Sequence, residues 1–252
     1  MKPKITIAIC THNRHEILHE CLLALTKQTI EKKFFNVFIL DNSSGNITNP
    51  KMESECISLC KSHGFDYVKK PAKGISDARN ICIESTSTEI ISYIDDDSIC
   101  HENFIEEVLK AFSGDPDLLV VGGKVVPDWR LVDRPQWLSN KSLGFLSMLD
   151  FGSDILHRNQ KDCQFINMGE PSGFYLVGAN ITYHRNVFNK HGLFDLEYGR
   201  SATNLTLMGG EETEMIRRIP TKYDSRIIWS PHIKVNHICL LYTSPSPRDG
   251  HQ

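Results

Sequence analysis

Short apolar runs alternate with segments of helical periodicity through the first half of the chain. Four runs bounded by turn-forming residues predict strands, and they span Lys4–Cys10, Phe35–Leu40, Phe65–Val68 and Ile90–Ile94. Apolar residues spaced three and four apart predict helices between them, over residues 17–25, 51–62 and 76–84. Strands and helices that alternate at this length predict a parallel sheet with helices on both faces.

The second half follows a different pattern. A helix is predicted over Asn103–Phe112 and a long apolar strand over Leu118–Val126, whereas residues 127–170 have no clear period. An irregular segment of that length is usually a functional loop or lid. The remaining expected elements are a short helix at Glu211–Arg218 and strand pieces at Phe174–Val177, Ile181–Tyr183, Arg226–Trp229 and Lys234–Val235. We therefore predict an α/β domain with two lobes, residues 1–126 and 127–238.

Composition narrows the class of protein. A length of 252 residues suits one large α/β domain or two small ones. The net charge of −3 gives no reason to expect a nucleic-acid partner. Neither a signal peptide nor an apolar run of the ~18–20 residues that span a membrane is recognised. Eight cysteines are scattered without a zinc-binding pattern, so we expect reduced thiols and a cytoplasmic protein.

Three consecutive carboxylates, Asp95, Asp96 and Asp97, follow the strand predicted at Ile90–Ile94. Like charges this close raise each other's pKa values unless a positive group lies among them. A divalent cation held by oxygen ligands and by a substrate's phosphates supplies that charge, and ligands bind at the carboxyl ends of strands in open α/β sheets. The triplet therefore predicts a metal–nucleotide site. The alternative is a solvated acidic turn whose Asp residues cap the next helix.

Polar residues follow the other predicted strands too. Thr11, Asn13 and Arg14 come after the first strand and Asp41 after the second, so they are expected on the same rim as the triplet. Asp41 can accept a hydrogen bond from an imide or a ribose hydroxyl, and Arg14 and Arg79 suit phosphates. No dinucleotide-binding glycine motif follows the first strand, and no P-loop motif occurs. A mononucleotide held through a metal fits these residues better.

Eight ordered segments carry a resemblance to a known family. They are residues 5–14 (ITIAICTHNR), 40–45 (LDNSSG), 73–80 (KGISDARN), 93–98 (YIDDDS), 177–188 (VGANITYHRNVF), 192–195 (GLFD), 209–218 (GGEETEMIRR) and 231–237 (PHIKVNH). Each is a weak signal alone, but in this order the series resembles the family 2 glycosyltransferases. The resemblance implies the GT-A fold, with a Rossmann-like, mostly parallel sheet, and transfer of a sugar from a nucleotide-sugar to a hydroxyl acceptor.

The resemblance also implies a donor site. The residues that it places around the base and ribose are Thr11, Asn13, Arg14 and Asp41, and those along the nucleotide are Lys73, Gly74, Arg79 and Asn80. It implies that Asp95 and Asp96 lie near ribose and metal, with Asp97 the principal ligand of Mn²⁺ or Mg²⁺. The structural alternatives are a surface ion pair for Arg79 and a turn for Asn13.

Glu211 and Glu212 form a second candidate centre at the start of a predicted helix, after Gly209 and Gly210. An inverting transfer needs a base that takes the proton of the acceptor hydroxyl. The family usually has Glu-Asp here with the Asp as the base, which implies that role for Glu212 although its side chain is one methylene longer. The alternative is acidic charge that favours a helix N-terminus.

His237 lies where members of the family often carry a His close to the metal or diphosphate, and a neutral imidazole can bind Mn²⁺-like ions. A structural histidine is the alternative. Trp129, Trp137 and Tyr175 could stack on sugar rings or pack in the core.

The C-terminal residues 239–252 have no helix or strand period and contain Pro245 and Pro247. The run Cys239–Asp249 resembles a translated sequencing adapter, so we expect a non-native, disordered tail without function.

The sequence thus predicts an inverting, metal-dependent glycosyltransferase. Its donor is expected to be a nucleoside-diphosphate sugar, with a UDP-sugar favoured. By analogy, its acceptor is a saccharide or lipid-linked sugar at the inner face of the membrane, with peripheral membrane association. One alternative is a nucleotide-sugar-binding module without turnover. A nucleotidyltransferase is a second, but it would need a basic, Gly-rich loop after the first strand, which is absent.

Overall fold

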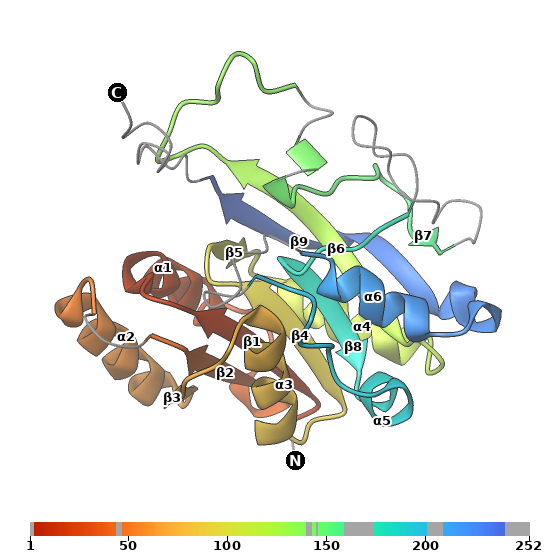
Figure 1. The fold of residues 1–252 in the computed structure, drawn as a ribbon, viewed down its shortest axis with the longest axis horizontal. Helices are drawn as coiled ribbons and strands as arrows, with labels where there is room; N and C mark the ends of the chain where they lie inside the picture. The colour runs from red at the N-terminus through yellow and green to blue at the C-terminus, as the bar shows by residue number, and fades with distance from the viewer. Residues whose placement is uncertain are drawn as a thin grey trace.

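A single mixed sheet runs through the centre of the molecule, with helices packed on it (Figure 1). The computed structural model describes residues 3–43, 47–139, 143–144, 146–158, 174–200 and 209–239. In this part of the chain the sheet has nine strands. The predicted α/β class is confirmed.

The first half of the chain builds the parallel part of the sheet. Its elements are β1 (Ile5–Thr11), α1 (His15–Leu25), β2 (Phe35–Asp41), α2 (Pro50–His63), β3 (Asp66–Lys69), α3 (Ile75–Ser85) and β4 (Ile90–Asp95). The strands lie in the order β3-β2-β1-β4, and all three neighbouring pairs are parallel. Every strand and helix predicted here is present, with only its ends displaced.

The order of these strands decides which helices share a face of the sheet. The crossovers β1–α1–β2 and β2–α2–β3 run toward one edge, whereas β3–α3–β4 runs back across the sheet. Because such crossovers are right-handed, α3 lies on the face opposite α1 and α2. In agreement, α1 packs against α2, and α3 packs on β1 and β2 (Figure 1).

The second half extends the sheet with mostly antiparallel strands. Its elements are β5 (Ser98–Cys100), α4 (Phe104–Gly114), β6 (Val120–Asp128), β7 (Leu156–His157), β8 (Asn180–His184), α5 (Asn186–His191), α6 (Glu211–Arg218) and β9 (Ile227–Ile238). The sheet continues from β4 through β8, β6 and β9 to β5, and β7 pairs with β9. One sheet therefore crosses the boundary between the two predicted lobes, whose division stays a prediction.

Several predictions for this half were wrong. Phe174–Val177 forms no strand, because its backbone pairs with no neighbouring strand. The two late strands are one continuous strand, β9. Sequence reasoning also missed β5, β7 and α5, which are short and have no clear period of their own. Of the long irregular segment, residues 140–142, 145 and 159–170 lie outside the described residues.

A bulge explains why β9 looked like two strands. Pro231 interrupts the apolar pattern and has no N–H to donate to a ladder. The pairing of β6 with β9 shifts at this point: Gly123 pairs with Ser230, but Lys124 pairs with Lys234. The extra residues of β9 therefore loop out without ending the strand.

The Asn180 side chain stabilises this bulge from β8. Its Nδ2 donates to the Ile233 carbonyl at 3.0 Å and to the Lys124 carbonyl at 3.2 Å. Gly123 is required beside it, because a Cβ there would overlap both the Ile233 carbonyl oxygen and the Asn180 amide. Asn180 is fully buried, and a polar group left without its partner in the interior lowers stability.

Asn180→Ala is expected to lower the free energy of unfolding by about 1–3 kcal/mol, because it leaves buried carbonyls without their donor. Urea denaturation at pH 7 measures this. The matched control is Asn189→Ala, which removes the same amide from an exposed position of α5 and should change stability little. Equal midpoints for the two variants would contradict the role given to Asn180.

Candidate functional site

The carboxyl ends of β1, β2 and β4 meet at one rim of the sheet, as predicted. The register pairs Thr11 with Asp41 and Cys10 with Asp95, so the polar residues that follow these strands lie side by side. The Thr11 hydroxyl donates to Asp96 Oδ2 at 2.7 Å. After Asp95 the chain turns at Asp96–Asp97 and enters β5, where Ser98 pairs with His237 of β9. This pairing brings His237 to the triplet.

Arg14 supplies positive charge to the Asp triplet. Its guanidinium lies 2.8 Å from Asp96 Oδ1 and 2.5 Å from Asp97 Oδ2. Burial raises the pKa of Asp96 to about 7, although Arg14 acts in the opposite direction. Burial and the charge of Asp97 also raise the pKa of Asp95. Arg14 therefore contacts the acidic residues directly, and its predicted contact with a phosphate stays a prediction.

Asp95, Asp97 and His237 could hold a cation. One potential ligand atom from each lies within 4.8 Å of the others. His237 Nε2 is 3.1 Å from Asp97 Oδ1, yet this buried oxygen has no hydrogen-bond donor among the described residues. Carboxylate oxygens with an imidazole nitrogen are ligands that suit Mn²⁺. The arrangement fits a divalent cation, and it contains all three residues predicted as metal ligands.

Glu211 and Glu212 share one guanidinium. They begin α6 directly after Gly210, and Arg79 Nη1 lies 2.9 Å from Glu211 Oε1 and 2.8 Å from Glu212 Oε1. Burial and the charge of Glu212 raise the pKa of Glu211, and Arg79 opposes this rise. Gly178 is needed here, because a Cβ would overlap both Glu212 and Arg79.

Arg79 is almost completely buried, so it is not the surface ion pair considered as an alternative. Its guanidinium lies over the rings of Tyr93 and Phe194, 5.5 and 5.6 Å from their centroids. Burial and the charge of Asp97 are the main causes of the raised pKa of Asp95, and the charge of Glu212 contributes to it as a smaller cause. The acidic pair and the Asp triplet therefore belong to one electrostatic neighbourhood.

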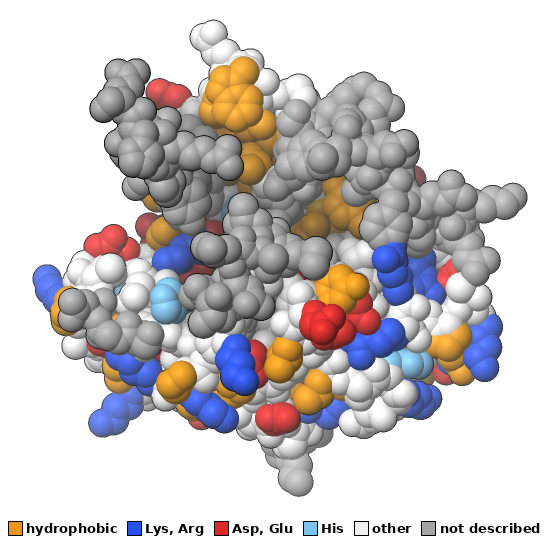
Figure 2. Space-filling view, viewed as in Figure 1, with side chains coloured by type: hydrophobic (Ala, Val, Ile, Leu, Met, Phe, Trp, Pro, Cys, Tyr) orange, Lys and Arg blue, Asp and Glu red, His pale blue; other side chains and the backbone are white. Residues whose placement is uncertain are grey.

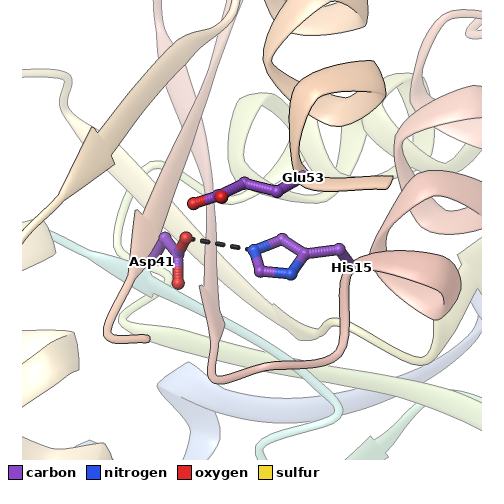
Figure 3. Close-up of side chains that lie close together, drawn as sticks. All are labelled: His15, Asp41 and Glu53. Carbon is purple, nitrogen blue, oxygen red and sulfur yellow. Dashed lines mark hydrogen bonds and ion pairs between the residues drawn. The ribbon is translucent and has the colours of Figure 1, made fainter. Parts of the chain in front are cut away.

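Asp41 is fully buried, and three neighbouring residues contact its carboxylate. Figure 3 shows it beside His15 and Glu53: His15 Nε2 is 3.1 Å from Asp41 Oδ2. The Tyr67 hydroxyl donates to the same oxygen at 2.7 Å, and the Ser43 N–H donates to Oδ1 at 2.8 Å. Burial raises the pKa of Asp41, but these hydrogen bonds outweigh it and the net pKa is lowered.

The other predicted nucleotide-binding residues lie on both sides of this rim. Asn13 has a left-handed backbone, φ 55°, which suits a turn, and its N–H donates to Ser43 Oγ. Lys73 and Gly74 lead into α3, where the Lys73 N–H donates to Asp77. Among the described residues, no hydrogen bond joins the Asn80 side chain to the Asp triplet. Its amide instead exchanges two hydrogen bonds with the Phe194 backbone.

Sequence reasoning missed the buried partners of these residues. His15 and Tyr67 hold Asp41, and Gly178 makes room for Glu212. Of these partners, only Gly178 lies in a motif that the sequence analysis singled out, the segment 177–188. That motif did not reveal which residues the glycine contacts across the fold. The sequence did not distinguish His12, which lies in the loop after β1, from His15, which begins α1. Residues 240–252 of the predicted tail lie outside the described residues, whereas Cys239 is buried and its N–H donates to the Asp128 carbonyl.

The model of the glycosyl transferase family 2 matches residues 6–192. The chain belongs to this family. It is 25% identical to the glucosyl-dolichyl phosphate glucuronosyltransferase of Haloferax volcanii over 241 residues, which cover 95% of this chain and 70% of that protein. It is 29% identical to the glycosyltransferase AglE of the same organism over 123 residues, 49% of this chain and 40% of that one.

Solved glycosyltransferases share the fold. The mannosyltransferase PcManGT from Pyrobaculum calidifontis, in complex with GDP-Man and Mn²⁺, superposes with a TM-score of 0.65 at 15% identity and covers 96% of this chain. S. aureus TarS 1–349 in complex with UDP-GlcNAc gives a TM-score of 0.64 at 15% identity and covers 99% of it. The chain spans 59% and 63% of these two proteins' lengths. The predicted GT-A fold is thereby confirmed.

The described helices include none that is both long and apolar enough to cross a membrane. Acidic and basic side chains are interspersed over the described part of the face in Figure 2, as the net charge of −3 suggests.

Asp41→Asn is expected to lower stability at pH 7 by about 1–3 kcal/mol, the cost of weakening buried hydrogen bonds to a charged group. Because the folded pKa of Asp41 is lowered, its contribution is present above the unfolded pKa near 4 and is lost as pH falls through the folded value. Urea denaturation at pH 7, 5 and 3.5 should therefore show the difference from wild type shrinking at the lowest pH.

The exposed carboxylate of Asp154 provides the control for this titration. Asp154→Asn should leave the unfolding free energy close to wild type at every pH. A difference between Asp41→Asn and wild type that stays constant from pH 7 to 3.5 would count against the buried carboxylate being ionised in the folded protein.

Proposed function

We propose that this chain transfers a sugar, with inversion, from a nucleoside-diphosphate sugar to a hydroxyl acceptor. The observation that carries the proposal is that the structure has two acidic centres whose charges act on each other. The cation-ligand set combines Asp95 at the end of β4 and Asp97 in the turn after it with His237 of β9. The acid pair Glu211–Glu212 begins α6, with its charge acting on Asp95. Family membership and GT-A neighbours with bound nucleotide-sugars support the same reaction class.

Asp97, Asp95 and His237 would hold the metal. A divalent cation there would neutralise charge on the diphosphate leaving group. Mn²⁺ in the mannosyltransferase neighbour supports this assignment. Arg14 contacts Asp96 and Asp97 directly, so we propose that it balances their charge when no donor is present.

Glu212 is proposed as the general base. Its carboxylate would take the proton of the acceptor hydroxyl while that oxygen attacks the anomeric carbon. Arg79 fixes Glu212 Oε1 at 2.8 Å and is itself held between two rings, so the carboxylate has a defined position before the acceptor arrives. Glu211 shares the same guanidinium and is proposed to orient the pair.

The remaining donor contacts are proposed on the rim around the triplet. Thr11, Asn13 and Asp41 would lie near the base and ribose, and Lys73 and Gly74 along the nucleotide. Asp41 already accepts hydrogen bonds from Ser43 and Tyr67 and lies beside His15, so a base would share its carboxylate with these neighbours. One structural neighbour was solved with GDP-Man and another with UDP-GlcNAc. Of these two kinds of donor, we propose a UDP-sugar.

The acceptor is proposed to be a lipid-linked or polysaccharide hydroxyl presented at the cytoplasmic face of a membrane. The Haloferax relative, a glucosyl-dolichyl phosphate glucuronosyltransferase, supports a lipid-linked sugar. Trp137 is 79% exposed and Leu131 is also exposed, which leaves apolar surface for such a molecule in the second half of the chain. Transfer from UDP-, GDP- and dTDP-sugars to polyprenyl-phosphate sugars, measured by release of the nucleoside diphosphate, tests donor and acceptor together.

A donor-binding module without turnover is the second candidate. The specific observation in its favour is that the chain spans 59% of the length of the mannosyltransferase neighbour. Donor binding by calorimetry with neither transfer nor donor hydrolysis would support this candidate over the first.

Asp97→Asn is expected to weaken Mn²⁺-dependent donor binding by more than about tenfold, since loss of even a supporting partner of a metal site costs ~10–100-fold. Calorimetry with UDP-GlcNAc and GDP-Man, with Mn²⁺ or with EDTA, measures it. The exposed Asp195 gives the control variant Asp195→Asn. Donor affinity that is identical in Mn²⁺ and EDTA would refute a metal role for Asp97.

Glu212→Gln keeps the shape of the side chain and removes its basicity, so transfer should fall by ~10²–10⁴. Donor affinity should stay near wild type, and Glu211→Gln should have the smaller effect on rate. Single-turnover transfer and donor calorimetry on both variants measure this. Retained turnover in Glu212→Gln with loss in Glu211→Gln would reverse the two roles, and retained turnover in both would place the base elsewhere.

A further inference from the structure

The thiols of two cysteines from different elements, β1 and α3, are in contact beside the candidate site. Cys10 Sγ of β1 lies 3.8 Å from Cys82 Sγ of α3. Among the cysteines that the structure describes, Cys10 alone is partly exposed, and the six others are buried. A reachable thiol next to a second thiol is the arrangement found in redox-sensitive proteins, where the second thiol resolves the oxidised first one.

The pair also has a specific position relative to the acidic centres. Cys10 is the register partner of Asp95 and directly precedes Thr11, which binds Asp96. Cys82 lies one helical turn after Arg79 on α3. The two thiols therefore connect the strand end that supports the Asp triplet with the helix that carries the partner of Glu212.

We propose that Cys10 and Cys82 form a reversible redox site whose substrate is a low-molecular-weight disulfide such as oxidised glutathione. The Cys10 thiolate attacks one sulfur of the small disulfide, forms a mixed disulfide and expels one thiolate. Cys82 then loses its proton and attacks the Cys10 sulfur, which forms the Cys10–Cys82 bond and expels the second small thiolate. Two protein thiols are oxidised, the small disulfide is reduced to two thiols, and the released thiolates take up the two protons.

The order of the two attacks follows from the surroundings of each thiol. Contact with Cys10 and burial raise the pKa of Cys82, so Cys82 stays protonated while the pair is reduced. Cys10 is the thiol that a solute can reach. Conversion of Cys10 to a mixed disulfide removes the contact that holds the Cys82 proton and presents a sulfur within its reach.

Bond formation must change the site. A disulfide requires the sulfurs to approach from 3.8 Å to about 2.05 Å, which draws the end of β1 and the second turn of α3 together. Arg79 is on that helix and holds Glu211 and Glu212, so oxidation should lower donor binding and transfer. This consequence rests on the proposed function, whereas the formation of the bond does not.

Mapping of the cross-link tests the site directly. The folded protein is incubated with oxidised glutathione, remaining thiols are alkylated, and the chain is digested with trypsin and a glutamate-specific protease. Cleavage after Glu84 separates Cys82 from Cys100, so a link between peptides 5–14 and 80–84 identifies the pair. We expect this link in the wild type and its loss after dithiothreitol.

Variants separate the two steps. Cys82→Ala should accumulate the mixed disulfide on Cys10, and Cys10→Ala should form neither product. Cys56→Ala is the matched control, because Cys56 is also a buried cysteine, but its thiol donates to the His15 carbonyl and contacts neither Cys10 nor Cys82. It should cross-link Cys10 to Cys82 as fast as wild type. If Cys10→Ala fails to fold, Cys10→Ser and the wild-type map decide the question.

Three outcomes would overturn the proposal. They are absence of the 5–14/80–84 link, equally fast linking of Cys56 to Cys60, and a link that forms only in urea. A second arm adds UDP-GlcNAc or GDP-Man with Mn²⁺, which should slow modification of Cys10 severalfold. If the link forms but no donor binds the reduced protein, the redox site stands and the proposed function fails.

Discussion

The compensation of negative charge at the carboxyl end of β4 is the constraint on which the rest of the site depends. Asp96 and Asp97 are buried beside Asp95, and burial of like charges is costly unless positive groups offset it. Arg14 from the loop after β1 and His237 from β9 approach the triplet from opposite ends of the chain. The pairing of β5 with β9 at this rim places His237 beside the triplet.

A second balance of charge links the halves of the fold. Arg79 on α3 contacts Glu211 and Glu212 at the start of α6, and aromatic rings enclose its guanidinium. The two carboxylates would repel each other without it. Because α3 packs on the parallel strands, this ion pair fixes the base proposed for the acceptor side relative to the strand ends proposed for the donor side.

The sites described here share one stretch of backbone. Residues 10–14 contain the partly exposed Cys10, the hydroxyl that binds Asp96, and the guanidinium that contacts Asp96 and Asp97. A covalent change at Cys10 therefore acts on residues already engaged in holding the acidic groups. Under the two proposals together, the redox state of Cys10 and Cys82 acts on donor binding through the contact between β1 and α3.

The sequence by itself determined the parallel half of the sheet, the polar rim at its strand ends and the helix Glu211–Arg218, because apolar period and strand-end polarity are local signals. The resemblance to the family implied that Asp95, Asp97 and His237 hold a metal, whereas their gathering depends on the pairing of β5 with β9. It predicted Arg79 and Asn80 as nucleotide ligands, yet their partners in the fold are Glu212 and the Phe194 backbone. The sequence pattern divided β9 at Pro231, because a bulge is specified by the neighbouring strand. Only tertiary structure decided these contacts, since each joins residues more than a hundred positions apart or depends on pairing that no local pattern encodes.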